Sequence, residues 1–186
     1  MPISPTTTST SWDEARREAH WRTAEVVFAE LRRSRIQFPD RLHSLAEAVS
    51  VLEEELDELK DAVRANLIEH ARAEAVQVSA MALRLIIDLE PHELSEARDR
   101  LAVQAAVSKT LHLEQPPERL VSAHEGRGLI RCQHEQLCAA LVAENFGPDE
   151  QMRRAVTAAY GIAVLALRFV AEVPADPYRR DAGCRR

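Results

Sequence analysis

The sequence predicts an all-α fold, a helical bundle of about six helices. Its 186 residues include only five glycines and 4% aromatic residues, while Ala, Leu, Glu and Arg dominate, a composition that favours helices over sheets. Apolar side chains recur at alternating spacings of three and four between proline-containing breaks, which is the pattern of amphipathic helices. With 46% apolar residues the chain can bury a core, as one domain or as two small repeats.

The first helix is expected from about residue 12 to residue 35. Before it, the polar residues 1–10 are expected to be disordered. Ser11 and Glu14 have the spacing of a capping box, with Ser11 as the N-cap and Glu14 reaching back to it. The proline-containing break FPD at 38–40 ends this helix.

Two further helices are expected in the first half of the chain. One covers about 41–66, where leucines and valines form a single buried stripe. The next begins at 67 or 70 and ends at 89, because Glu90 and Pro91 stop it. This third helix is apolar nearly all round, which is typical of the central helix of a bundle.

The second half of the chain repeats this plan. QFPDRLHS at 37–44 matches QPPERLVS at 115–122 at five of eight positions, an offset of 78. ALRLIIDLEP at 82–91 resembles ALRFVAEVP at 166–174 at an offset of 84, which places about six extra residues in a loop at 145–150. We therefore predict a tandem pair of helical units, in preference to a chance likeness between helices rich in Ala and Leu.

This repeat defines the expected domain organisation. Residues 11–91 form the first unit, and residues 92–173 form the second unit, packed on the first. Each unit is expected to contain about three helices. The remaining residues, 174–186, are expected to be a flexible tail.

An acidic run, EEELDE at 53–58, lies on the second predicted helix. At about 100° per residue, Glu53 and Asp57 fall on a solvated face. Glu54 lies at the edge of that face, whereas Glu55 and Glu58 fall on the other flank, among small and apolar residues. A carboxylate that is buried without a partner is strongly unfavourable, so it must find a cation or become neutral.

Glu74 presents the same anomaly on the third predicted helix, because it lies on an apolar stripe with Gln77 one turn away. Glu55, Glu58 and Glu74 on facing helices would form a cage of oxygen ligands, which suits Mg²⁺ or Mn²⁺. Carboxylates at i, i+3 spacing on bundle helices build such sites. The alternative is that the acids pair with arginines such as Arg72 or Arg84.

Two acidic motifs carry a family resemblance. EELDE at 54–58 matches the pattern EExxE, and after fifteen residues EAVQ at 74–77 matches ExxD except at its last position. The pair resembles the MazG-like, all-α nucleoside triphosphate pyrophosphohydrolases, in the form common in phages and actinobacteria in which Gln replaces that Asp. The resemblance covers residues 39–90 and extends to 12–90 as a unit.

The resemblance implies an Mg²⁺-dependent enzyme that hydrolyses an NTP or a dNTP to the monophosphate and pyrophosphate. It makes Glu55, Glu58, Glu74 and Gln77 metal ligands, and Glu54 and Glu55 catalytic, with Glu54 either an outer ligand or the residue that orients the attacking water. Gln77 is the departure from the family pattern, since a carboxamide brings no charge and cannot act as a general base. The alternative is a catalytically weak or inactive module that binds nucleotides or another protein.

The second half lacks these acids. At the two offsets the counterparts of the site residues are Cys132, Gln133, Gln136, Ala158 and Gly161. We therefore predict a degenerate unit, which supplies the helices that a partner subunit supplies in dimeric relatives. A homodimer of this chain stays open as an alternative.

Two other groups of residues have simpler explanations. Zinc-ligand types occur at Cys132, His134 and Cys138, but no fourth ligand is evident nearby, so packing is favoured. Cations that could meet phosphates occur on the fourth predicted helix, at Arg98, Arg100 and Lys109. A solvated helix face is favoured for these three.

Charge and composition restrict the partners. The net charge of −6, without a basic face to offset it, excludes nucleic acid. Three cysteines form an odd, sparse set, which is typical of a reducing cytosol. The polar N-terminus does not read as a signal peptide, and the longest apolar run, near 162–171, is interrupted by Arg168 and too short to span a bilayer. We expect a soluble cytoplasmic protein without a membrane partner.

Overall fold

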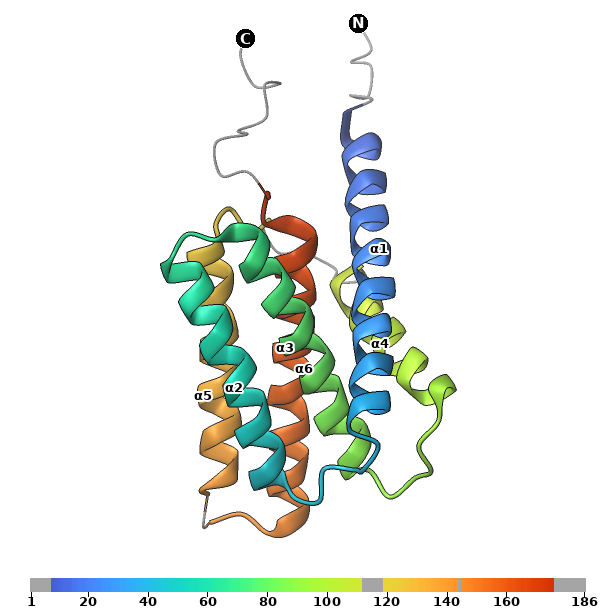
Figure 1. Ribbon diagram of the computed structural model, residues 1–186, viewed down its shortest axis with the longest axis vertical. Coiled ribbons are helices and arrows are strands. Elements are labelled where there is room, and N and C mark those ends of the chain that lie inside the picture. The colour runs from blue at the N-terminus through green and yellow to red at the C-terminus, as the bar shows by residue number, and fades with distance from the viewer. Residues whose placement is uncertain (1–7, 112–118, 144, 176–186) are drawn as a thin grey trace, which may run out of the picture.

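The computed structural model describes residues 8–111, 119–143 and 145–175, with backbone alone for residues 8–13. These residues form six α-helices and no strand, which confirms the all-α prediction (Figure 1). The helices are α1 (Thr8–Gln37), α2 (Leu45–Arg64), α3 (Ile68–Leu89), α4 (Glu96–Leu111), α5 (Ala123–Leu141) and α6 (Pro148–Glu172).

Helices α3 and α6 lie side by side at the centre of the bundle (Figure 1). Helix α2 packs on α3, α5 packs on α6, and α2 and α5 meet each other on the same side. The long helix α1 covers α3 and α6 on the opposite side, with α4 beside it. The two central helices also share a buried hydrogen bond, which the Ser79 hydroxyl donates to the Ala163 carbonyl (3.0 Å).

The helix boundaries correct the sequence predictions at three places. Helix α1 begins at Thr8, so Ser11 lies within it and is not its N-cap, and residues 8–10 are helical. Helix α2 begins only at Leu45, because Ser44 caps it by accepting a hydrogen bond from the Glu47 amide. Helix α6 begins at Pro148, so only 145–147 of the expected loop 145–150 precede it. The expected disorder of residues 1–7 and flexibility of 176–186 fall outside the described residues.

The α2–α3 and α5–α6 halves use the same N-terminal cap. Ser122 caps α5 as Ser44 caps α2, with closely similar extended backbone angles. In each half a glutamate at the third helical position accepts from the amide before the cap, from His43 to Glu47 (2.6 Å) and from Val121 to Glu125 (2.8 Å). Both caps therefore have the Ser-x-x-Glu pattern of a capping box, 78 residues apart, with the glutamate bound to the amide one residue before the cap.

A buried ion pair also recurs in the two halves. Arg84 pairs with Asp88 on α3, and Arg168 pairs with Glu172 on α6. In each pair the two residues are four positions apart, about one helical turn. In both halves the acid accepts from the backbone amide of a leucine before the cap, at 3.1 Å and 3.0 Å. The contacts therefore recur at the offsets of 78 and 84, while the origin of the halves by duplication stays a prediction.

Helix α6 alone, within the described part of the chain, is long and apolar enough to cross a membrane by length and composition. In that apolar window, 61% of the residues are buried inside the protein. The central helix of a soluble bundle passes the same test. The position of α6 against α3 and α5 therefore accounts for its apolar character.

Candidate metal centre

Three carboxylates from two helices meet at one point. Glu55 and Glu58 come from α2 and Glu74 from α3, and one oxygen of each lies within 4.8 Å of the others. Such oxygens can hold a cation, as the sequence predicted for this trio. The identity of the ion is not fixed by this arrangement, because Mg²⁺, Mn²⁺ and Ca²⁺ all take carboxylate oxygens.

The three acids differ in burial. Glu74 is 4% exposed and Glu55 is half-buried, whereas Glu58 is exposed. The expectation that Glu58 interrupts a buried flank is therefore wrong, because its side chain is exposed to solvent although it meets Glu74 of α3. The cluster is closed at Glu74 and open to solvent at Glu58, so an ion can enter it from the solvent side.

The electrostatics of the cluster favour a cation. Burial, followed by the negative charges of Glu58 and Glu74, raises the pKa of Glu55 to about 7. Burial and the charge of Glu58 likewise raise the pKa of Glu74. A bound cation would remove the repulsion that causes part of both shifts.

Glu74 has two polar neighbours on its own helix. His70 lies one turn earlier, with its Nδ1 3.3 Å from the carboxylate, and Gln77 donates from its Nε2 to the same carboxylate (2.7 Å). The amide nitrogen of Gln77 thus faces Glu74 in this structure. Its predicted role as an oxygen ligand requires the opposite orientation of the amide, which a rotation of the terminal torsion provides.

The expected alternative partners are engaged elsewhere. Arg84 binds Asp88, the Ser34 hydroxyl and the backbone carbonyls of two residues that follow α1. Arg72 donates to the Val173 carbonyl and lies near Glu69. The interpretation that Arg72 or Arg84 neutralises the acids is therefore wrong.

A cleft of about 570 Å³ opens beside the cluster, between α1, the segment 38–43 and the first turns of α2. Glu55 belongs to both the cluster and the cleft, and Glu54 also lines the cleft. Sequence reasoning missed two residues of α1, Glu30 and Arg33, which pair with each other (2.6 Å) and face this cleft. The charge of Glu30 contributes to the raised pKa of Glu55, which shows that α1 approaches the cluster.

The other candidate cations lie apart from the cleft. Arg98 pairs with Glu90 (2.7 Å), and Arg100 stacks over the Phe28 ring (4.0 Å) beside Glu25. Lys109 is exposed on α4. These contacts agree with the expected helix face and not with a phosphate site.

Comparison with protein-family models, with curated proteins and with solved structures gave no match to this chain.

Proposed function

We propose that the protein is an Mg²⁺-dependent nucleoside triphosphate pyrophosphohydrolase of the MazG-like type, acting in the cytoplasm on an NTP or dNTP. The observation that carries the proposal is the trio Glu55, Glu58 and Glu74, which shares Glu55 with a cleft large enough for a nucleotide. The motif resemblance supplies the reaction class. We also propose that the chain consists of two tandem helical units of this type and that the second unit is degenerate.

The charge of the cleft indicates how such a substrate would bind. Its acids are Glu30, Asp40, Glu47, Glu54 and Glu55. Its cations already have partners: Arg33 binds Glu30, Arg41 binds backbone carbonyls, and Arg84 binds Asp88. A bare polyphosphate is therefore repelled, and it can enter only together with a divalent cation.

The residues fit such a cation, since three carboxylate oxygens meet there and the charges of Glu58 and Glu74 help to raise the pKa of Glu55. Glu55, Glu58 and Glu74 would hold Mg²⁺, or Mn²⁺ in its place, with Gln77 as a neutral fourth ligand. When bound, the ion would offset the triphosphate charge and polarise the reacting phosphorus.

The protein's own residues then have separate tasks. Glu54 is exposed at the cleft wall next to Glu55, so it can accept a hydrogen bond from a water and orient it toward the α-phosphorus. As the new phosphorus–oxygen bond forms, the proton passes to Glu54, and the bond to the α,β-bridging oxygen breaks. Pyrophosphate leaves with that oxygen, and the monophosphate remains.

The test is pyrophosphate release from a panel of NTPs and dNTPs with Mg²⁺ or Mn²⁺. Glu55→Gln should lower kcat/KM by about 100-fold or more, since one ligand and one charge are lost from the transition state. Asp61→Asn is the matched control, because it removes one exposed carboxylate from the same helix. Equal losses in both variants would contradict the assignment of Glu55.

A second function, a nucleotide-binding module without turnover, is favoured by one observation. Gln77 holds Glu74 through a neutral amide where the motif has a carboxylate. This function predicts no pyrophosphate from any substrate, together with a melting temperature that rises with nucleotide only when Mg²⁺ is present. If folded protein showed no pyrophosphate release and no such rise in melting temperature, both functions would be refuted.

A further inference from the structure

A second group of metal-ligand side chains lies between α2 and α5, apart from the acidic trio. Glu53 of α2 meets His134 and Cys138 of α5, and one ligand atom of each lies within 4.8 Å of the others. Glu53 is exposed, as predicted for a solvated face, and packing was the expected role of His134 and Cys138. The three side chains also meet one another across the helix pair.

We propose that a zinc ion, or a similar transition-metal ion, binds here through Glu53, His134 and Cys138. The atoms are already spaced for it: His134 Nε2 lies 3.4 Å from Glu53 Oε1 and 3.3 Å from Cys138 Sγ. Glu53 Oε1 and Cys138 Sγ are 3.9 Å apart. Tetrahedral zinc with bonds of about 2.0–2.3 Å places its ligand atoms about 3.3–3.6 Å apart, so only small adjustments are needed.

The helix geometry explains why these three residues converge. His134 and Cys138 are four residues apart on α5, so they lie on one face, one turn above the other. Helix α2 packs against that face and brings Glu53 to it. Cys132 is exposed and six residues from Cys138, so it does not share the face. The ligand set therefore replaces Cys132 with Glu53, a residue that the sequence spacing on α5 could not indicate.

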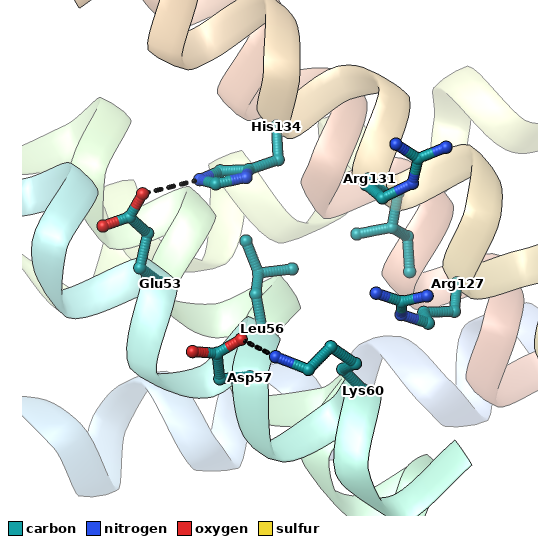
Figure 2. A pocket seen from close by; sticks show the side chains of 8 residues that line it. Glu53, Leu56, Asp57, Lys60, Arg127, Arg131 and His134 are labelled. Carbon is teal, nitrogen blue, oxygen red and sulfur yellow. Dashed lines mark hydrogen bonds and ion pairs between the residues drawn. The ribbon is translucent and has the colours of Figure 1, made fainter. Parts of the chain in front are cut away.

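The fourth coordination position has room for water. Glu53 and His134 line a cavity of about 340 Å³ between α2 and α5. Figure 2 shows both side chains approaching from opposite helices, with Arg127 and Arg131 on the α5 wall and Lys60 held by Asp57 on the α2 wall. A site with three protein ligands and one open position has the donor set of an exchangeable or catalytic zinc site more than of a closed structural one.

The chemistry of the donors separates this site from the acidic trio. Sulfur and imidazole nitrogen prefer zinc, cobalt or copper, whereas three carboxylates prefer Mg²⁺ or Mn²⁺. A bound ion would also link the α2–α3 half to the α5–α6 half, since its ligands come from both. The proposal does not depend on the pyrophosphohydrolase function.

The experiment is titration of the full chain with Co²⁺, followed by its absorption spectrum. One equivalent should produce a near-ultraviolet thiolate-to-cobalt band and visible bands of tetrahedral cobalt, and Zn²⁺ should abolish both by displacement. Cys138→Ser should remove the thiolate band, and His134→Gln or Glu53→Gln should weaken Co²⁺ binding by about tenfold or more. Cys132→Ser is the matched control and should leave the spectrum unchanged.

Three results would overturn the proposal. They are the absence of a thiolate band at about tenfold excess of Co²⁺, retention of the band in Cys138→Ser, and its loss in Cys132→Ser. Far-ultraviolet circular dichroism of each variant verifies that its helices are intact. Glu55→Gln should retain the cobalt spectrum, so the result is independent of the activity assay.

Discussion

The helical hairpins α2–α3 and α5–α6 share their caps and their buried ion pairs but differ in the acidic cluster and in core packing. Both begin with a Ser–Glu capping box, and both bury an arginine–carboxylate pair near the end of the second helix. Only the first hairpin carries the acidic trio. The ion pairs that support the frame are thus present in both hairpins, whereas the three clustered carboxylates are present in the first hairpin alone.

In the second hairpin, the space that corresponds to the acidic trio is filled by a neutral side chain. Gln133, at the position of Glu55, lies over Gly161, at the position of Gln77. A Cβ added at Gly161 would approach Gln133 Oε1 to 2.3 Å, so the amide fills the space that a side chain at 161 would need. A neutral amide packed on a glycine requires no cation, in contrast to three clustered carboxylates.

Core packing differs between the hairpins in a compensating way. Gly126 of α5 lies against Phe169 of α6, whereas the corresponding positions in the first hairpin hold two buried residues, Ala48 and Leu85. A larger ring in one hairpin is thus matched by a smaller residue facing it. The frame tolerates exchange of volume between positions as long as the total is kept.

The largest effect should come from the acids that both hairpins share. Asp88→Asn and Glu172→Gln each leave a buried arginine without its full counter-charge, and we expect each to lower the free energy of unfolding by about 3–5 kcal/mol. Glu172 has further partners: the close contact with His20 (3.1 Å) and hydrogen bonds from Arg168, the Leu120 amide and Arg16 outweigh its burial and hold its pKa well below the usual range. Urea unfolding at neutral pH measures both variants.

Asp61→Asn is the control for these two variants, because it removes an exposed carboxylate from α2 and should change little. A large loss in Asp88→Asn with almost none in Glu172→Gln would break the comparison. It would mean that the two hairpins do not depend on the same frame.

A smaller effect should follow from exchanging core volume. Gly126→Ala places a Cβ 2.6 Å from the buried Phe169 ring, and we expect a loss of about 1–3 kcal/mol in unfolding free energy despite the better helix propensity of Ala. Phe169→Leu should restore part of this loss in the double variant, because it recreates the Ala48 and Leu85 combination. A double-mutant cycle in urea measures the coupling, and additive losses would contradict the compensation.

The sequence was sufficient for the helices, because breakers and apolar periodicity are local signals. It placed α3 almost exactly, and it misplaced the start of α2 although Ser44 and Glu47 carry a capping box as clear as the one at Ser11. Local pattern alone therefore did not decide which of two similar capping signals begins a helix.

The acidic trio was predictable for the same local reason, since helix angle and spacing placed Glu55, Glu58 and Glu74 toward one another. Residues contributed by other helices were not. The approach of Glu30 to Glu55, and of His134 and Cys138 to Glu53, depends on how α1 and α5 are rotated against α2. Periodicity shows which face of a helix is apolar but not which polar edge meets a given neighbour.

The smallest effect, and the most specific to the difference between the hairpins, is the pH dependence that Glu55 causes. Its pKa is about 7 in the folded protein, against about 4.3 in an unfolded chain. Between these values the folded state binds a proton that the unfolded state lacks, so the unfolding free energy falls as pH rises through this window and is then constant.

Glu55→Gln should remove that fall. Without metal, the variant should exceed the wild type by about 1 kcal/mol at pH 8, a value reduced for the solvent that reaches this half-buried group, and should approach it at about pH 4, below the unfolded-state pKa. Mg²⁺ should reverse the order at pH 8, because it stabilises only the protein whose cluster is intact. Thermal unfolding at both pH values, with and without Mg²⁺, measures all four quantities. A variant that is less stable than the wild type at pH 8 without metal would show that Glu55 supports the frame, as Asp88 does, and that the hairpins differ in packing alone.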